Sequence, residues 1–509
     1  MNKFYRTGAY APFYGNRNYC GIDCSYSRLF YFYVLMRKKS KLFYTFLFVL
    51  LTNLCADNSY NVLMICVDDL RNSLGCYGNK DVISPNFDQL ASESVIFDHH
   101  YVQVPTCGAS RYALLTGQRP QTRKSMGNGA FHQLSKTQTE GAQTLPEMFR
   151  RSNYVTSVIG KVSHTADGRN YAYNGKGDGS DELPFAWDWK KTPFGPWERG
   201  WGVFFAYADG VHREDNSGYK PRMEFKDLKD NELPDGLSAD EAIRQLEELK
   251  DKRFFLGLGF YKPHLPFVAP KKYWDMYEGV EIKTAVNQKK SSYWHGSGEF
   301  YKYQGDKNKP LSTEEQVKHR RAYYACISYV DAQLGKVMQK LKVLGLDKNT
   351  IVVLWSDHGW HLGDHQIWGK HNLHEQALKS PFMIRVPGIE GKMRSAVVET
   401  IDLFPTLMEL CQPTFNRLAQ PLSGQSLVQI LNSVDALGRD SALSFWQNAV
   451  SLRTNKYRLI ATKGKMGNYT KIELYYHRDD PDERKNVAQK KPEVVQDLLK
   501  VLIKGNTLK

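Results

Sequence analysis

The stretch Asn61-Val-Leu-Met-Ile-Cys-Val-Asp-Asp-Leu70 is an almost continuous apolar run that ends in two acidic residues. A run of this kind is typical of a strand that is buried on both faces of a parallel sheet. Open α/β sheets bind ligands beyond the carboxyl ends of their strands. The stretch therefore predicts a parallel α/β core, with Asp68 and Asp69 at the edge where a ligand would bind.

A second strand of the same kind lies far along the chain and also ends in groups that bind metals. Thr350–Trp355 is apolar, and Ser356-Asp357-His358-Gly359 follows it. One acidic pair at a strand end is more often a helix cap or a loop hydrogen bond than a functional site. Two such strand ends in one chain favour a hard cation, Ca²⁺ or Mg²⁺, because both prefer oxygen ligands. The geometric tolerance of Ca²⁺ suits the mixed ligands.

The rest of the chain alternates between helical and strand patterns and contains no repeats. Ser84-Pro85 is expected to begin one helix, and the capping boxes at Ser238 and Ser312 two more. Such alternation predicts a doubly wound α/β fold. Beyond about residue 440, short strands predict a small α+β domain. Other expected elements are strands Tyr154–Ile159 and Phe254–Phe260, and helices 108–118, Thr144–Arg151, Ser238–Lys250, Ser312–Leu344 and Glu493–Ile503.

The composition is that of a globular protein. The chain has 509 residues, of which 41% are hydrophobic and 24% are charged, and this length indicates two or more domains. The net charge is +15, but residues 1–56 hold eight Lys/Arg and one Asp, so the rest of the chain has a net charge of about +8. This moderately basic body suits an anionic substrate, and we expect no nucleic-acid partner. Eight cysteines without paired spacing exclude a disulfide scaffold.

The N-terminal region contains a targeting pattern. Met36 is followed by a basic cluster, by the apolar run Leu42 to Leu51 and by a small residue, Ala56, at a cleavage point. This is the pattern of a signal peptide at 36–56, with residues 1–35 as upstream sequence. The alternative is a signal anchor that also uses Tyr26–Leu35, but the basic cluster interrupts it. We expect a secreted, periplasmic or lysosomal protein without stable membrane insertion, since the run is too short to span a bilayer.

The prediction of function depends on one short motif around Cys107. Val104-Pro-Thr-Cys-Gly-Ala-Ser-Arg111 is followed by Leu115-Thr116-Gly117-x-Arg119-Pro120, with Cys107 at the start of a predicted helix. A cysteine in such a place is usually just a small hydrophobe. The double motif, however, resembles the signature of the type I sulfatase family, in which the cysteine is oxidised to formylglycine by a formylglycine-generating enzyme. The commoner family form has proline at the position of Ala109.

Further motifs extend the resemblance from Asn61 to about Ala488. Within the family the chain resembles the iduronate-2-sulfatase branch most, by Gly160-Lys161-Val-x-His164, Lys262-Pro-His264-x-Pro-Phe, His358 after Asp357, and Trp368-x-Lys370. The resemblance implies an alkaline-phosphatase-like α/β/α sandwich with a smaller C-terminal α+β domain. We place the catalytic domain at 57–440 and the C-terminal domain at 441–509. The long C-terminal insertions of the animal enzyme are shorter here.

The resemblance also implies roles for individual residues. Hydrated formylglycine at 107 is a gem-diol, one oxygen of which attacks sulfur while loss of the proton from the other expels sulfate. Arg111 would stabilise the gem-diol, Lys161 and Lys370 would bind sulfate oxygens, and His264 or His164 would protonate the leaving oxygen. The cation would be held by Asp68, Asp69, residue 107, Asp357 and His358.

The resulting prediction is a hydrolase that removes sulfate from a sulfated saccharide, at the 2-O position of a uronic acid. Alternatives are a sulfatase of other regiospecificity, a phosphoester or phosphonate hydrolase, and an inactive carbohydrate-binding relative. Residues 165–235 are predicted to form long loops that contain several tryptophans. These tryptophans either stack on sugars or only cover the core, and we slightly favour the first alternative. The spacing of the histidines between 361 and 374 does not favour a zinc site.

Overall fold

The computed structural model describes residues 60–506, with gaps at 216, 291–296, 306–309 and 465–467. The upstream segment 1–35 and the signal peptide 36–56 lie outside the described residues, so both stay predictions. In the described part of the chain, no helix is long and apolar enough to cross a membrane.

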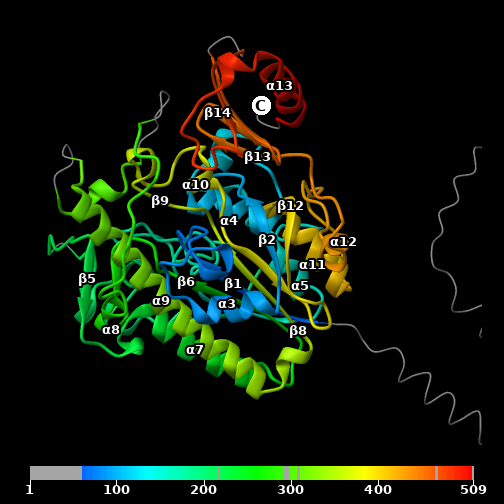
Figure 1. Ribbon diagram of the computed structural model, residues 1–509. Coiled ribbons are helices and arrows are strands. Elements are labelled where there is room, and N and C mark those ends of the chain that lie inside the picture. The colour runs from blue at the N-terminus through cyan, green and yellow to red at the C-terminus, as the bar shows by residue number, and fades with distance from the viewer. Residues whose placement is uncertain (1–59, 216, 291–296, 306–309, 465–467, 507–509) are drawn as a thin grey trace, which may run out of the picture. The chain divides into compact units, whose positions relative to one another are not determined.

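The first predicted strand forms β1 (Asn61–Val67), in the interior of an eight-stranded sheet (Figure 1). β1 pairs in parallel with β6 (Phe254–Phe260) on one side and with β8 (Thr350–Ser356) on the other. The order across the sheet is β12-β2-β11-β8-β1-β6-β3-β4. The remaining strands are β2 (Val95–Tyr101), β3 (Val155–Gly160), β4 (Trp189–Lys190), β11 (Phe382–Arg385) and β12 (Lys392–Glu399).

One strand of this sheet departs from the predicted parallel core. β11 runs antiparallel to both of its neighbours, β2 and β8, so the sheet is mixed. The sequence pattern missed β2 because Asp98, His99 and His100 interrupt its apolar run. The three adjacent strands β6, β1 and β8 are parallel as predicted.

Alternate residues of β1 face two separate cores, because successive side chains of a strand point to opposite faces. Leu63 and Ile65 pack with one helical layer, and Val62 and Met64 pack with the other. Helices on both faces confirm the predicted α/β/α sandwich. The first layer contains α3 (Pro85–Ser92), α7 (Pro234–Leu249) and α9 (Thr313–Val343), and the second contains α4 (Cys107–Thr116), α5 (Leu145–Arg150), α11 (Leu403–Cys411) and α12 (Val428–Asn432).

The predicted helix starts are confirmed for α9 and α3 but wrong for α7. The capping box at Ser312 begins α9, since the Ser312 hydroxyl accepts from the Glu315 amide at 3.2 Å and Glu315 accepts from the Ser312 amide at 2.7 Å. The predicted start of α7 at Ser238 is wrong. That helix begins four residues earlier at Pro234, whose fixed φ suits the first turn. α3 begins at Pro85 as predicted.

The C-terminal region forms the predicted small α+β domain. Four antiparallel strands lie in the order β13-β14-β15-β16, and the helix α13 (Pro492–Gly505), red in Figure 1, follows. Its apolar core also includes Val104 and Ala109, which flank Cys107. The C-terminal domain therefore helps to hold the segment with the sulfatase-like motif. The strands are β13 (Ala442–Trp446), which the sequence did not predict, β14 (Ala449–Arg453), β15 (Tyr457–Lys463) and β16 (Tyr469–Tyr476).

Short elements complete the described chain. Two small two-stranded sheets pair β5 with β7 and β9 with β10. The strands and α-helices not yet given are β5 (Met223–Lys226), β7 (Phe267–Pro270), β9 (His361–Leu362), β10 (Trp368–Gly369), α6 (Gly200–Phe204), α8 (Lys271–Asp275) and α10 (Glu375–Leu378).

Candidate active site

The two acidic strand ends meet at the carboxyl edge of the sheet. Val67 and Ser356 are paired in register at the ends of β1 and β8, so the residues that follow lie next to one another. The Asp69 amide donates to Asp357 Oδ1 at 3.0 Å, and His358 Nε2 lies 3.4 Å from Asp69 Oδ1. All of these acidic and histidine side chains are fully buried. The structure thus brings the four predicted metal-site residues of the two strands together.

Cys107 is the first residue of α4 and lies against these acids. Its Sγ is 3.5 Å from Asp68 Oδ1, 3.4 Å from His358 Nε2 and 3.2 Å from Lys370 Nζ. Burial, and next the Asp68 carboxylate, raises the pKa of the Cys107 thiol well above its ordinary value. An unmodified thiol here stays protonated at neutral pH and is a poor nucleophile.

The donor set at this place fits a divalent cation. Asp68, Asp69, Cys107 and His358 each offer one ligand atom, and these atoms lie within 4.8 Å of one another. Asp69 Oδ2 is buried and accepts no hydrogen bond from any described residue. Burial, with the neighbouring acids, raises the pKa of Asp69 well above its usual range. A bound cation would remove this cost, because it favours the ionised carboxylate.

Arg111 lies behind the acids and not in the opening to solvent. Its Nε donates to Asp357 Oδ2 at 3.0 Å, its Nη2 lies 3.5 Å from Asp68 Oδ2, and its Nη1 donates to the Lys161 carbonyl. The guanidinium is completely buried. Its observed contacts therefore join the ends of β1, β3 and β8 through charge-assisted hydrogen bonds.

The two predicted sulfate-binding lysines line one pocket together with Cys107. Lys161 follows β3, forms an ion pair with Asp68 and lies with its Nζ 3.9 Å from the centre of the Phe204 ring. Lys370 follows β10, and its Nζ is 2.6 Å from Asp69 Oδ1. Both ammonium groups are nearly inaccessible outside a single pocket. The arrangement can hold an anion directly over residue 107.

The two predicted proton donors line the same pocket. His264 follows β6 in a loop fastened by Lys262, whose Nζ donates to the carbonyls of His264 at 3.1 Å and Pro266 at 2.7 Å. Burial lowers the pKa of His264. Burial and the nearby Lys161 lower the pKa of His164 well below its ordinary value. Both shifts favour the neutral imidazole, although the nearby Glu299 carboxylate opposes the shift in the pKa of His264.

The pocket has a volume of about 180 Å³ and contains residues that the sequence did not indicate. Glu299 is the most consequential, since its carboxylate lies 2.8 Å from His264 Nε2 and 3.3 Å from Lys370 Nζ. Arg213 and Lys302 add two more cations. Glu299 and Arg213 lie outside helices and strands, and Lys302 ends a three-residue 3₁₀ helix, so no periodic pattern predicted them. The full lining is Thr106, Cys107, Asn128, Lys161, His164, Tyr173, Phe204, Phe205, Arg213, His264, Gly298, Glu299, Lys302, Lys370 and His371.

The slight preference for tryptophans that stack on sugars was wrong. Trp187, Trp197 and Trp201 are at most 6% exposed, and Trp189, in β4, is half-buried. None of the four lines the pocket. Its aromatic wall instead consists of Tyr173, Phe204 and Phe205. These four tryptophans instead cover the core, which is the second alternative given in the sequence analysis.

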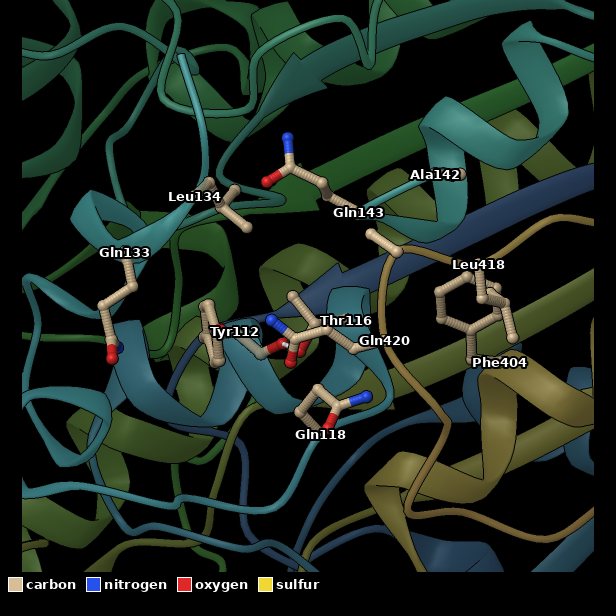
Figure 2. Close-up of a pocket in the computed structure, with 11 residues that line it drawn as sticks. Tyr112, Thr116, Gln118, Gln133, Leu134, Ala142, Gln143, Phe404, Leu418 and Gln420 are labelled. Carbon is tan, nitrogen blue, oxygen red and sulfur yellow. Dashed lines mark hydrogen bonds between the residues drawn. The ribbon is translucent and has the colours of Figure 1, made fainter. Parts of the chain in front are cut away.

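A second cavity, at the other end of α4, does not belong to the site. Figure 2 shows its lining of glutamine amides and apolar side chains, which includes Gln118, Gln133 and Gln143. Its volume of about 30 Å³ is that of one water molecule. It lacks the acids, histidines and lysines that surround Cys107.

Comparison with known proteins agrees with this geometry. The chain is 33% identical over 395 residues to iduronate 2-sulfatase of Mus musculus, covering 70% of this chain and 69% of that protein. It is 31% identical over 456 residues to a sulfatase of Formosa agariphila, covering 84% and 83%. In fold, it matches the phosphonate monoester hydrolase of Agrobacterium radiobacter with a TM-score of 0.68 at 22% identity, covering 87% and 95%.

Two family models together cover nearly all of the described chain. One described as N-sulphoglucosamine sulphohydrolase, C-terminal, matches residues 363–507. One described as sulfatase matches residues 60–413, which include Cys107 and both acidic strand ends. The chain therefore belongs to the sulfatase family, and it is a sulfuric ester hydrolase with an alkaline-phosphatase-like fold.

Proposed function

We propose that this sulfatase removes the 2-O-sulfate from a uronic acid in a sulfated saccharide. The main observation in support of the proposal is the set of cationic side chains that line one small pocket. Lys161 and Lys370 line this pocket together with residue 107, where a sulfate group would react, and Arg213 and Lys302 line it as well. A substrate with two anionic groups, a sulfate and a carboxylate, matches these two pairs of cations. The 33% identity to an iduronate 2-sulfatase supports the same substrate class.

Arg213 is well placed to select a carboxylate. It is 5% exposed, its Nη1 donates to the Tyr303 hydroxyl at 3.1 Å, and its Nε pairs with Glu214 at 2.7 Å. Its guanidinium carbon lies 3.4 Å from the centre of the Phe205 ring. Because these contacts hold the guanidinium in place, little side-chain freedom is lost when an anion binds.

Residue 107 acts, in this proposal, as formylglycine rather than as cysteine. In its hydrated form it supplies one hydroxyl that attacks sulfur and a second whose deprotonation expels sulfate. The buried Cys107 thiol, with its raised pKa, would not do either. The proposal requires a formylglycine-generating enzyme as a partner during maturation.

The same proposal assigns roles to the surrounding side chains. Asp68, Asp69, Asp357 and His358 would hold Ca²⁺, or alternatively Mg²⁺, together with residue 107, and the cation would supply positive charge next to the reacting oxygen. Lys161 and Lys370 would bind the sulfate oxygens. His264 or His164 would give a proton to the leaving sugar oxygen. Arg111 would keep Asp68 and Asp357 in place and neutralise charge.

The test is sulfate release from a disaccharide that ends in 2-O-sulfated iduronate, with an aryl sulfate measured in parallel. The protein is produced together with a formylglycine-generating enzyme, and Cys107→Ala is the control. We expect release from both substrates and none from the variant. Turnover of the aryl sulfate without release from the sugar would exclude the proposed substrate. Release by Cys107→Ala at the same rate would exclude the role of residue 107.

The predicted cellular location is also part of the proposal. A signal peptide at 36–56 would deliver the protein to a secreted, periplasmic or lysosomal location, where sulfated saccharides are degraded. N-terminal sequencing of the mature protein tests it. A new N-terminus close to Ala56 is expected, whereas an intact residue 1 in a membrane fraction would contradict the proposal.

A further inference from the structure

Another hollow, distinct from the small cavity at the other end of α4, lies beside the catalytic pocket, at the junction with the C-terminal domain. Arg123, Met126, Gly127, Trp446, Gln447 and Asn448 line it, and its volume of about 500 Å³ is open to solvent. Arg123 and Met126 belong to a short 3₁₀ helix, and Trp446 is the last residue of β13. None of these residues belongs to the proposed catalytic machinery.

The hollow and the catalytic pocket share a wall. Gly127 lines the hollow, and the next residue, Asn128, lines the pocket. On the other side, the ring of His371, which lines the pocket, stacks on Trp446 with a centroid distance of 5.0 Å and an interplanar angle of 16°. A saccharide seated over Cys107 could therefore continue past His371 and Asn128 into the hollow.

The hollow is held in a fixed position relative to Cys107. The amide of Phe445 donates to the Gln103 carbonyl at 2.8 Å, which ties β13 to the segment that leads into the motif. Gln447 and Asn448 form a two-residue turn, in which Gln447 has φ +54°. Asn448 Nδ2 donates to the Lys463 carbonyl at 3.1 Å and braces that turn. Preformed walls of this kind lower the entropic cost of binding.

The chemistry of the lining points to an anionic sugar. Trp446 is only partly buried and offers an aromatic surface with an N–H donor, Gln447 adds an amide, and both suit a sugar ring with hydroxyl groups. Arg123 is exposed, and no ion pair joins it to any acid within the described ranges. A guanidinium without an acidic partner can pair with a sulfate or carboxylate.

We propose that Arg123, Trp446 and Gln447 form a second saccharide subsite, which binds the sugar residue next to the sulfated one. Arg123 pairs with an anionic group on that second sugar. This inference rests on the proposed function, because it requires a sulfated saccharide in the catalytic pocket. It adds that the preferred substrate is an anionic oligosaccharide rather than a single sugar.

The test compares KM for a sulfated tetrasaccharide with KM for the matching sulfated monosaccharide. Arg123→Ala and Trp446→Ala should each raise the KM for the tetrasaccharide by about tenfold, the equivalent of about 1.4 kcal/mol, and Arg123→Ala should leave the monosaccharide KM unchanged. Lys124→Ala is the matched control, since Lys124 is exposed beside Arg123 but does not line the hollow. Equal KM values for both substrates in the unmodified protein, or no effect of Arg123→Ala, would overturn the subsite.

Two further measurements distinguish loss of the subsite from loss of folding and from failure of the proposed function. Trp446 contacts the core of the C-terminal domain, so thermal unfolding must show that Trp446→Ala is folded. Gln447→Ala, in the exposed turn, is the second variant and should raise the tetrasaccharide KM without a loss of stability. If no sugar is hydrolysed, the proposed function fails, and calorimetric titration of the same tetrasaccharide then tests the subsite by itself. Equal affinity of the unmodified protein and Arg123→Ala would reject it.

Discussion

Glu299 places a carboxylate in the position where a substrate anion would bind, since it pairs with both His264 and Lys370. A sulfate ester must displace this carboxylate before it can reach those cationic groups. We therefore expect Glu299→Gln to lower KM for the sulfate ester and the inhibition constant of free sulfate, each by about tenfold. Steady-state kinetics measure both. Glu278→Gln, at an exposed position, is the control, and an unchanged or higher KM in Glu299→Gln would contradict the expectation.

Arg213 provides a prediction about substrate choice. If it binds the uronate carboxylate, Arg213→Ala removes a charge-assisted hydrogen bond and costs about 1.5–3 kcal/mol of substrate binding. The loss should be seen as a higher KM for the uronate substrate, with little change for an aryl sulfate that lacks the carboxylate. An equal loss for the two substrates would show that Arg213 supports the pocket as a whole rather than selecting the substrate.

At the scale of elements, the position of α4 depends on close contact with the segment that carries Asn128. A Cβ added to Gly108 would lie 2.4 Å from the Asn128 Cα, whereas one added to Gly127 would meet nothing within 4 Å. Gly108→Ala should therefore destabilise the protein by about 1–3 kcal/mol, even though alanine favours helices. Thermal unfolding measures the change, with Gly127→Ala as the control. A Gly108→Ala protein of equal or greater stability would show that the segment can move away.

The sequence predicted those elements whose patterns are local. The strands β1, β6 and β8 and the helix α9 formed as expected. Burial of a strand on both faces requires a continuous apolar run, and a capped helix requires capping residues, so both can be recognised in the local sequence. β2 was missed because Asp98 and His99 lie in the middle of it. The predicted start of α7 at Ser238 is wrong because the capping-box pattern there lies inside the helix, four residues after Pro234.

Within the candidate site, the residues named by the sequence stand in motifs at the ends of strands or at the start of a helix. The topology of the sheet brings such positions together, so motif and fold lead to the same residues. Glu299 and Arg213 come from irregular segments, whose course is set by tertiary packing and not by periodicity. Their positions could be learned only from the structure.

At the scale of the whole molecule, a buried ionic network joins the C-terminal sheet to the catalytic domain. Glu483 accepts from Arg458 Nε at 2.6 Å and from His374 Nδ1 at 3.1 Å, and Arg458 also pairs with Glu375. Burial opposes the ionisation of Glu483, but Arg458 and the hydrogen bonds from His374 and His477 outweigh it and hold the pKa of Glu483 well below its ordinary value. The network therefore stabilises the contact between the two parts while Glu483 is ionised.

Removal of one carboxylate from this network should destabilise the whole fold. Glu483→Gln leaves the Arg458 charge with less compensation, and breaking a buried pair in this way costs about 3–5 kcal/mol at neutral pH. Because the folded pKa lies below the unfolded value of about 4.3, the stabilisation is complete above that pH and is lost as the pH falls through the folded pKa. The gap in unfolding temperature between the two proteins should thus narrow below about pH 4.3.

Thermal unfolding from neutral to acidic pH measures this gap. Glu493→Gln, at an exposed position of α13, is the control and should follow the unmodified protein throughout. A gap of constant size across the whole pH range would contradict the account of the network.

The central claim is that residue 107 reacts as formylglycine, and one measurement tests it most directly. The tryptic peptide from Asp81 to Arg111 is analysed by mass spectrometry in preparations made with increasing amounts of a formylglycine-generating enzyme, and sulfate release is measured on the same samples. The account predicts that activity rises in proportion to the fraction of peptide in which the thiol has been replaced by an aldehyde. Full activity in a preparation that contains only cysteine at 107 would contradict it.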